Sequence, residues 1–388
     1  MLGVFIWGHL LGLFAAYLGA RRRYPPAHWR GGSSDAAKLR REGWGDYACS
    51  VLVAAPYPPP LPATRFARGG RGAASAVHCA GQLMLYFIEQ CLNGVQLGML
   101  LFLLAAGLTL VFGIMDLVNL AHGSLYMIGA YFAATFAALT GSFVAGAALA
   151  LVATLVVGMA VEVVVMRRLY GRDHLDHVLG TFGLILFFNE LVRWIWGPAG
   201  MTLPLPGEML TAVQVLPGIY YPVYRLVIIA VTLAVAASLY LFIMRTRVGM
   251  LIRAGAANRE MVGALGINIK LLYTLVFGLG AALAGFAGLM QAPILTVQIG
   301  MGENILILAF VVIIIGGIGS IRGAFVASLF VGLVDTLGRA FLPDLLRTAL
   351  SENAAETLGP ALSSMLIYML MAAVLVFRPE GLFPASRR

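Results

Sequence analysis

Residues 91–115 read CLNGVQLGMLLFLLAAGLTLVFGIM and contain no charged side chain. A bilayer core about 30 Å thick needs roughly 20 apolar residues in one helix, so this stretch is long enough to cross it. A helix is indicated because every backbone amide in lipid has to be hydrogen-bonded within the protein. Strands of a membrane barrel would alternate polar and apolar residues instead. Further uncharged runs cover residues 123–161, 226–244, 271–302, 304–321 and 358–377.

The composition of the whole chain agrees with a membrane protein. Of 388 residues, 61% are hydrophobic and 11% are charged, whereas a soluble domain carries roughly 25% charged residues. We therefore predict an all-α integral membrane protein, a polytopic bundle of about eight or nine transmembrane or re-entrant helices. The expected helices cover residues 88–112, 122–140, 143–166, 178–197, 225–244, 270–291, 303–319, 321–341 and 360–377.

The first 83 residues differ from the rest of the chain. They carry ten Lys and Arg against three Asp and Glu, so they hold +7 of the formal charge of +9, and residues 84–388 hold +2. The basic balance therefore belongs to this extension and gives no indication of a nucleic-acid partner. The extension is rich in Pro, Gly and Arg, which is typical of disordered segments. Three interpretations stay open: a signal anchor at its apolar start, a disordered tail, or a native protein that begins at Met84.

The arginines between the expected helices predict the orientation. They gather in residues 167–172, 245–259, 322 and 378–388. With alternating crossings all four groups lie on one face, and the loops at residues 197–224 and 292–302 on the other face contain no Lys or Arg. Since cytoplasmic loops carry an excess of Lys and Arg, the four groups and the C-terminus are expected in the cytoplasm. Four arginines do not follow this pattern, because they lie at or near the helix ends on the opposite face: Arg193, Arg225, Arg339 and Arg347.

The loop at residues 245–270 is too polar to span and is the largest on the arginine-bearing face. Within it, residues 256–265 have helical spacing, with Met261 and Leu265 four positions apart, and Gly266 is typical of a helix end. A short amphipathic helix suits a docking surface for a cytosolic partner. A surface helix lying on lipid headgroups fits the pattern equally well.

Two segments interrupt the apolar runs with polar or glycine residues. Residues 112–124 contain Asn119, His122 and Gly123, and residues 315–323 contain Gly316, Gly317 and Gly319. Transporter sites are often built from broken helices in corresponding positions of two repeats, so these six residues are candidates for the solute pathway. For His122, a structural hydrogen bond at a helix end is preferred to direct contact with a solute, because a histidine inside a membrane needs a partner or water.

Two further features are expected to stabilise the helix bundle and not to act in transport: a pair of small residues and a charged pair. Ala281 and Gly285 lie four positions apart, which allows neighbouring helices to approach closely. Glu190 and Arg193, at positions i and i+3, are expected to neutralise each other.

No motif in the sequence indicates an enzyme. The chain lacks the Gly-x-x-x-x-Gly-Lys-[Ser/Thr] phosphate loop, and it lacks His-Glu-x-x-His and Gly-x-Ser-x-Gly. Cys49, Cys79 and Cys91 have no metal or disulfide spacing. We expect no catalytic residue, metal or cofactor, and energy for uphill transport is expected to come from another subunit.

Four segments together resemble the permeases of branched-chain amino acid ABC transporters of the Liv type. They are residues 106–110 continuing into 118–123, Arg253-Ala254 with Asn258 to Gly266-Ile267, residues 316–323, and residues 377–383. The resemblance extends from Met84 to Phe383 and implies that residues 84–388 are the transmembrane domain of a permease. The family does not require residues 1–83, which favours a start at Met84.

The resemblance also implies a mechanism and partners. A second permease subunit would pair with this chain in the bacterial inner membrane, two cytosolic ABC ATPase subunits would dock on the pair, and a periplasmic binding protein would deliver the solute. The docking loop would be Arg253, Ala254, Asn258, Met261, Leu265 and Gly266. The family includes permeases for urea and short amides, so these solutes stay open beside branched-chain amino acids. A facilitator or channel that works without ATP is the alternative from another class.

Overall fold

Helices form most of the described chain, which a computed structural model gives for residues 72–115, 117, 119–348 and 350–383. Most of the predicted extension, residues 1–71, lies outside the described residues, as do Arg387 and Arg388. Within the compact unit Arg71–Arg388, the first helix begins at Gly72 and continues through residue 84 without interruption. The start at Met84 therefore stays a prediction.

The elements follow one another along the chain without long irregular segments. They are α3 (Gly72–Met115), α4 (His122–Thr140), α5 (Phe143–Val161), a π-helical turn (Glu162–Met166), α6 (Arg167–Leu169), α7 (His174–Trp196), a 3-10 turn (Gly207–Leu210), β1 (Ala212–Leu216), β2 (Ile219–Pro222), α8 (Val223–Arg245), α9 (Arg247–Ala257), α10 (Arg259–Ala264), α11 (Ile269–Gln291), α12 (Met301–Gly316), α13 (Ile321–Arg347) and α14 (Glu352–Phe377).

Eight of the described helices are long and apolar enough to cross a bilayer, which confirms the prediction of an all-α polytopic bundle. The seventh of the nine predicted helices, residues 303–319, corresponds to α12, which has 16 residues and is shorter than the roughly 20 residues of a full crossing. The last helix was predicted to start at Pro360, but α14 already begins at Glu352. The proline lies inside the helix there and does not mark its first turn.

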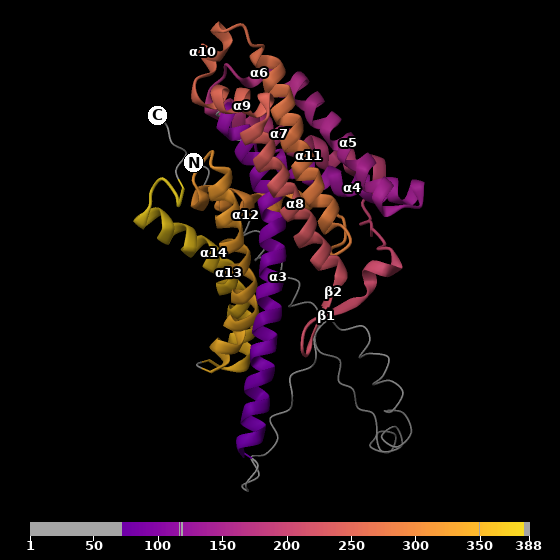
Figure 1. Cartoon of the computed structure of the whole chain (residues 1–388), viewed down its shortest axis with the longest axis vertical. Coiled ribbons are helices and arrows are strands. Elements are labelled where there is room, and N and C mark those ends of the chain that lie inside the picture. Colours follow the sequence, from indigo (N-terminus) through magenta and orange to yellow (C-terminus); the bar gives the residue numbers. More distant parts are fainter. Residues whose placement is uncertain (1–71, 116, 118, 349, 384–388) are drawn as a thin grey trace, which may run out of the picture. The chain divides into compact units, whose positions relative to one another are not determined.

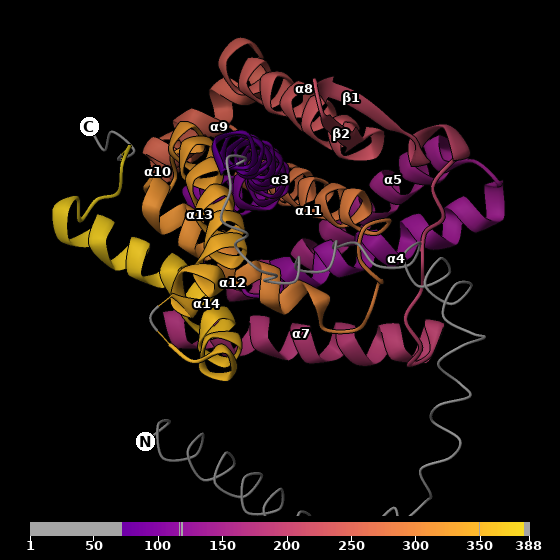
Figure 2. The ribbon, with the colours of Figure 1, turned by 90° about the horizontal axis from the view of Figure 1, so that it is seen from below.

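Helix α3 lies at the centre of this unit. Figure 2 looks nearly along α3 and shows α8, α11, α12 and α13 around it, and each of these helices contacts it. Figure 1 shows the same helix from the side. Among the spans, α3 and α11 are the most buried, and α14 is the least buried. The outer helices therefore present their apolar side chains to lipid or to partner subunits.

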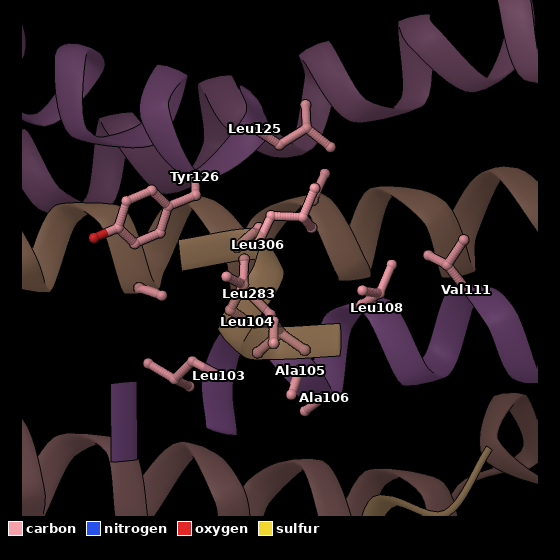
Figure 3. Packing of buried hydrophobic residues seen from close by; sticks show 14 of the residues in the cluster. Leu103, Leu104, Ala105, Ala106, Leu108, Val111, Leu125, Tyr126, Leu283 and Leu306 are labelled. Carbon is pink, nitrogen blue, oxygen red and sulfur yellow. The ribbon is translucent and has the colours of Figure 1, made fainter. Parts of the chain in front are cut away.

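The core lies where α3 meets α4, α11 and α12. Figure 3 shows leucines from all four helices converging there, and they belong to one buried cluster. The labelled residues are Leu103, Leu104, Ala105, Ala106, Leu108 and Val111 of α3, Leu125 and Tyr126 of α4, Leu283 of α11 and Leu306 of α12.

Glycines allow the central helices to touch backbone to backbone. A Cβ atom on Gly129 of α4 would lie 2.5 Å from the carbonyl oxygen of Gly285 on α11. One on Gly98 of α3 would lie 2.8 Å from the carbonyl oxygen of Ser328 on α13. Only glycine fits such crossings, because any side chain would overlap the neighbouring backbone. The close packing predicted for Ala281 and Gly285 is confirmed, since both are buried, Gly285 against Gly129 of α4 and Ala281 against Gly158 of α5.

The two loops without Lys or Arg lie at one end of the unit. Met201 and Val297 exchange two backbone hydrogen bonds of 2.8 Å, which ties residues 197–224 to the segment before α12. The antiparallel hairpin of β1 and β2 belongs to the same end. This agrees with the alternating crossings that the arginine pattern predicts.

Candidate functional site

The loop between α8 and α11 folds into two short helices, α9 and α10. The prediction of one helix over residues 256–265 was wrong, because Asn258 separates the two. Its backbone is extended, and its side-chain oxygen accepts a hydrogen bond of 2.9 Å from the backbone N–H of Met261. An asparagine in this role caps the start of a helix and ends the preceding one.

The six residues predicted for docking are distributed over both helices and the turn that follows them. Arg253 and Ala254 lie on α9, Asn258 is the cap and Met261 lies on α10, and Leu265 with Gly266 ends the pair. Gly266 has a φ of +81°, which favours glycine. Because α9 and α10 contact each other, the six residues belong to one local region.

The region exposes apolar side chains outside the spans. Met261 is 58% exposed and Leu265 is 72% exposed, whereas Ile252 and Val262 are buried against the bundle. An apolar patch at the end of a membrane protein marks a surface for a partner or for lipid. We refer to Met261 and Leu265, together with the exposed side of Arg253, as the docking surface, after the role that the sequence predicts for them.

The first helix break is buried. The side-chain Oδ1 of Asn119 accepts a hydrogen bond of 3.0 Å from the backbone N–H of Ala121. His122 has no exposed surface, and among the described residues its ring nitrogens have no hydrogen bond of normal geometry. The ring faces Gly107 and the Leu104 carbonyl on α3. Among the described residues, Asn119 makes the local bond at this helix end, and the capping bond expected for His122 stays a prediction.

The second helix break joins the C-terminal segment to α12. Gly317 and Gly319 have φ values of +99° and +82°, and the hydroxyl of Ser320 caps α13 by accepting a bond of 3.1 Å from the Gly323 N–H. The N–H groups of Leu382 and Phe383 donate to the carbonyls of Ile315 and Gly316, at 2.8 and 3.1 Å. Two of the segments that carried the family resemblance are thus direct neighbours.

The six candidate pathway residues lie in two separate places. Gly123 packs against Gly302 at the start of α12, where its Cβ would lie 2.9 Å from the Gly302 carbonyl carbon. Gly316 is fourteen residues farther along α12, about 21 Å away at 1.5 Å per residue. Gly113 at the end of α3, in contrast, does approach Gly319, with 3.7 Å between its Cβ position and the Gly319 Cα. Among their described residues, the two breaks approach each other at these edges.

One buried charged cluster was missed by the sequence analysis. The Glu162 carboxylate has no exposed surface and accepts hydrogen bonds from Arg167, Tyr170 and Thr274, at 3.0, 2.8 and 2.5 Å. It lies in the π-helical turn, a feature that often occurs at functional positions. Burial raises the pKa of Tyr170 far above its usual range, and the neighbouring carboxylate adds to this effect. A lone glutamate ending a long apolar run was the signal in the sequence.

We expect Glu162→Ala to destabilise the folded chain by about 1–3 kcal/mol, because two hydroxyls and a guanidinium lose their buried acceptor. Thermal unfolding of the purified chain in detergent measures this. Glu190→Ala is the matched control, since Glu190 pairs with Arg193 at 2.7 Å on an exposed surface, as predicted, and such pairs contribute about 0–1 kcal/mol. Equal melting temperatures for the two variants would contradict a stabilising role for the Glu162 cluster.

A separate contact links the second break to α8. The Arg322 guanidinium donates a hydrogen bond of 3.0 Å to the Tyr240 hydroxyl and lies 5.5 Å from the centre of its ring. Tyr240 precedes Arg245 on α8, and α9 follows directly. The glycine break and the docking region are therefore connected through one helix.

Comparison with known proteins decides the family. Residues 90–375 match the family described as the permease component of the branched-chain amino acid transport system. The chain belongs to this family. Three of the four segments that carried the resemblance lie inside the match, and the chain is accordingly a multi-pass membrane permease.

Curated relatives support the assignment over nearly their full length. The chain is 31% identical over 311 residues to the high-affinity branched-chain amino acid transport system permease protein BraD of Pseudomonas aeruginosa, which covers 76% of this chain and 95% of that protein. It is 31% identical over 310 residues to LivH of Escherichia coli, covering 76% and 97%. A probable LivH of Methanocaldococcus jannaschii is 25% identical over 298 residues, covering 73% and 88%. No solved structure matches the chain significantly.

Proposed function

We propose that this chain is one permease subunit of an ABC importer and forms half of a membrane pathway for branched-chain amino acids. The family match over residues 90–375 carries the proposal, and the names of the curated relatives supply the solute class. The partners are a second permease subunit, two cytosolic ABC ATPases and a periplasmic binding protein, in the inner membrane of a bacterium.

The exposed apolar side chains of the docking surface support the ATPase contact. Met261 and Leu265 are exposed in the loop that follows α8. Three arginines belong to the same end of the bundle: Arg245 ends α8, Arg247 begins α9, and Arg322 lies in the first turn of α13. Partner surfaces are enriched in methionine and depleted of charge at their centre. The sequence has no phosphate-binding loop of its own, so the energy for uptake has to reach the pathway through such a contact.

Reconstitution tests the proposal. Proteoliposomes that contain this chain, a second permease, the ATPases and the binding protein should take up labelled leucine only with ATP, and vesicles with this chain alone should take up none. Uptake by this chain alone would favour the facilitator. ATP-driven uptake of urea or a short amide without leucine would keep the ABC importer and reassign its solute.

The orientation gives a further prediction. In a variant whose Cys49, Cys79 and Cys91 are replaced by serine, a cysteine at Leu210 should react with a membrane-impermeant maleimide added to intact spheroplasts. A cysteine at Leu265 should react only after the membrane is opened, because the arginine pattern places that end in the cytoplasm. The reverse labelling would invert the proposed topology.

A further inference from the structure

A cavity of about 240 Å³ lies between α5, α8, α9 and α11. Every side chain on its wall is apolar. The wall includes Leu155 and Met159 of α5, Phe242 of α8, Val248 and Ile252 of α9, and Leu279 of α11. Pockets for drug-sized ligands run to roughly 300–1,000 Å³, so this cavity accommodates a slender chain and not a bulky ring system.

The mouth of the cavity opens on the apolar outside of the bundle. Leu275 lines the cavity and is 45% exposed. Val156 and Leu241, the sequence neighbours of the lining residues Leu155 and Phe242, are exposed as well. Val156 and Leu241 lie on α5 and α8, which rank among the less buried spans, and Leu275 is an exposed position of the more buried α11. Among the described residues, the exposed side chains named around the mouth are therefore apolar, and they can contact the hydrocarbon chains of lipids.

Positive charge borders the same cavity. Arg245 follows the lining residue Phe242 by three positions at the end of α8, and Arg247 directly precedes the lining residue Val248. Both arginines are exposed. The sequences of α8, α9 and α11 contain no acidic residue. At the end of α5, Glu162 is already bound by Arg167, so it does not neutralise the border.

We propose that this cavity binds one acyl chain of an anionic phospholipid whose headgroup lies on Arg245 and Arg247. An amino acid does not fit, because its charged groups would lose their hydration without any polar partner on the wall. Exposed basic residues at the end of a membrane helix attract anionic lipid headgroups. The apolar cavity and the cationic border thus recognise the two ends of one molecule.

The bound chain would contact α9 directly, since Val248 and Ile252 form part of the wall. A filled cavity would hold α9 against α5 and α11 at the position where the docking surface continues from it. Binding of the lipid does not depend on the function proposed above, and labelling and uptake are therefore measured separately.

Photocrosslinking of the full chain in lipid nanodiscs tests the proposal. The probe is a phosphatidylglycerol with a diazirine on one acyl chain, and its reference is a phosphatidylcholine with the same chain. Peptide mass spectrometry should find adducts of the first probe on α5, α9 and α11 around the cavity, several-fold above those of the second. Replacing Arg245 and Arg247 together by glutamine should lower the first signal to the level of the second.

Filling the cavity should remove the adducts. A Cβ atom on Gly278 would lie 2.7 Å from the flexible Met159 side chain, so Gly278→Leu directs its side chain toward this wall. Gly183→Leu is the matched control, because a Cβ atom on Gly183 of α7 meets no atom within 4 Å. Val248→Phe is the second filling variant, for use if Gly278→Leu does not fold.

The expected result is a several-fold loss of adducts in a folded filling variant and none in Gly183→Leu. Equal labelling by the two probes would overturn the proposal, as would unchanged labelling in a folded filling variant. Absence of adducts in the assembled transporter would also overturn it, because a partner subunit would then cover the mouth. None of these outcomes depends on whether the chain transports leucine.

Discussion

Replacing Met261 with glutamate is expected to lower ATP-driven uptake by the assembled transporter at least tenfold, equivalent to about 1.4 kcal/mol of lost contact energy. Met261 is 58% exposed and lies on α10 outside the spans, so the change should not disturb the core. Burying a carboxylate in an apolar contact is costly unless it is paired. Uptake and ATPase activity are measured in proteoliposomes that contain equal amounts of the chain, and Leu265→Glu should act in the same way.

Leu210→Glu is the control for this prediction. Leu210 is 69% exposed in the loop at the opposite end of the unit, and the same charge there should leave uptake unchanged. Copurification of the ATPases with each variant separates lost docking from lost folding. Normal uptake by both the Met261 and the Leu265 variants would remove α10 from the proposed contact.

The spans could be predicted from the sequence because lipid imposes a local rule. A run such as residues 91–115 has to be helical and long enough to cross, and neither condition depends on distant residues. The same rule fails for α12, which is apolar after its first turn but has only 16 residues. Its start is fixed by the contact between Gly302 and Gly123, and a contact between residues far apart leaves no local pattern.

The site was harder to predict for the same reason. The polar loop at residues 245–270 indicated a surface region outside the spans, but the break at Asn258 depends on a side-chain hydrogen bond that caps α10. The Glu162 cluster joins positions more than a hundred residues apart along the chain, through Thr274. The pairing of Leu382 with Ile315 is a backbone contact, which side-chain patterns do not encode.

These distant contacts connect the docking region to the helix breaks. Gly255 on α9 packs against Ile114 at the end of α3, with 3.8 Å between its Cβ position and the isoleucine methyl group. The adjacent Gly113 faces Gly319, and the break containing Gly319 is bonded to the C-terminal segment. The same Cβ position lies 3.3 Å from the Leu272 side chain of α11, so a movement of α9 would press on both α11 and the end of α3. This gives a physical route by which partner docking would act on the breaks.

The central crossing of α4 and α11 should tolerate no side chain. Gly129→Val is expected to destabilise the chain by about 3 kcal/mol or more, at the upper end of overpacking effects. The added Cβ would lie 2.5 Å from the Gly285 carbonyl oxygen, and this oxygen belongs to backbone that cannot rotate away. Gly285 cannot retreat either, because Thr154 of α5 lies directly behind it.

The amount of folded protein in membranes, measured by size-exclusion chromatography of a fluorescent fusion, reports this effect. A loss of about 3 kcal/mol lowers the ratio of folded to unfolded chains roughly a hundredfold. Gly183→Val on α7 is the matched control, because its Cβ would meet no atom within 4 Å, and it should accumulate like the parent chain. Normal accumulation of Gly129→Val would mean that α4 and α11 do not cross at this glycine pair, and the core in which α3, α4, α11 and α12 converge would have to be arranged differently.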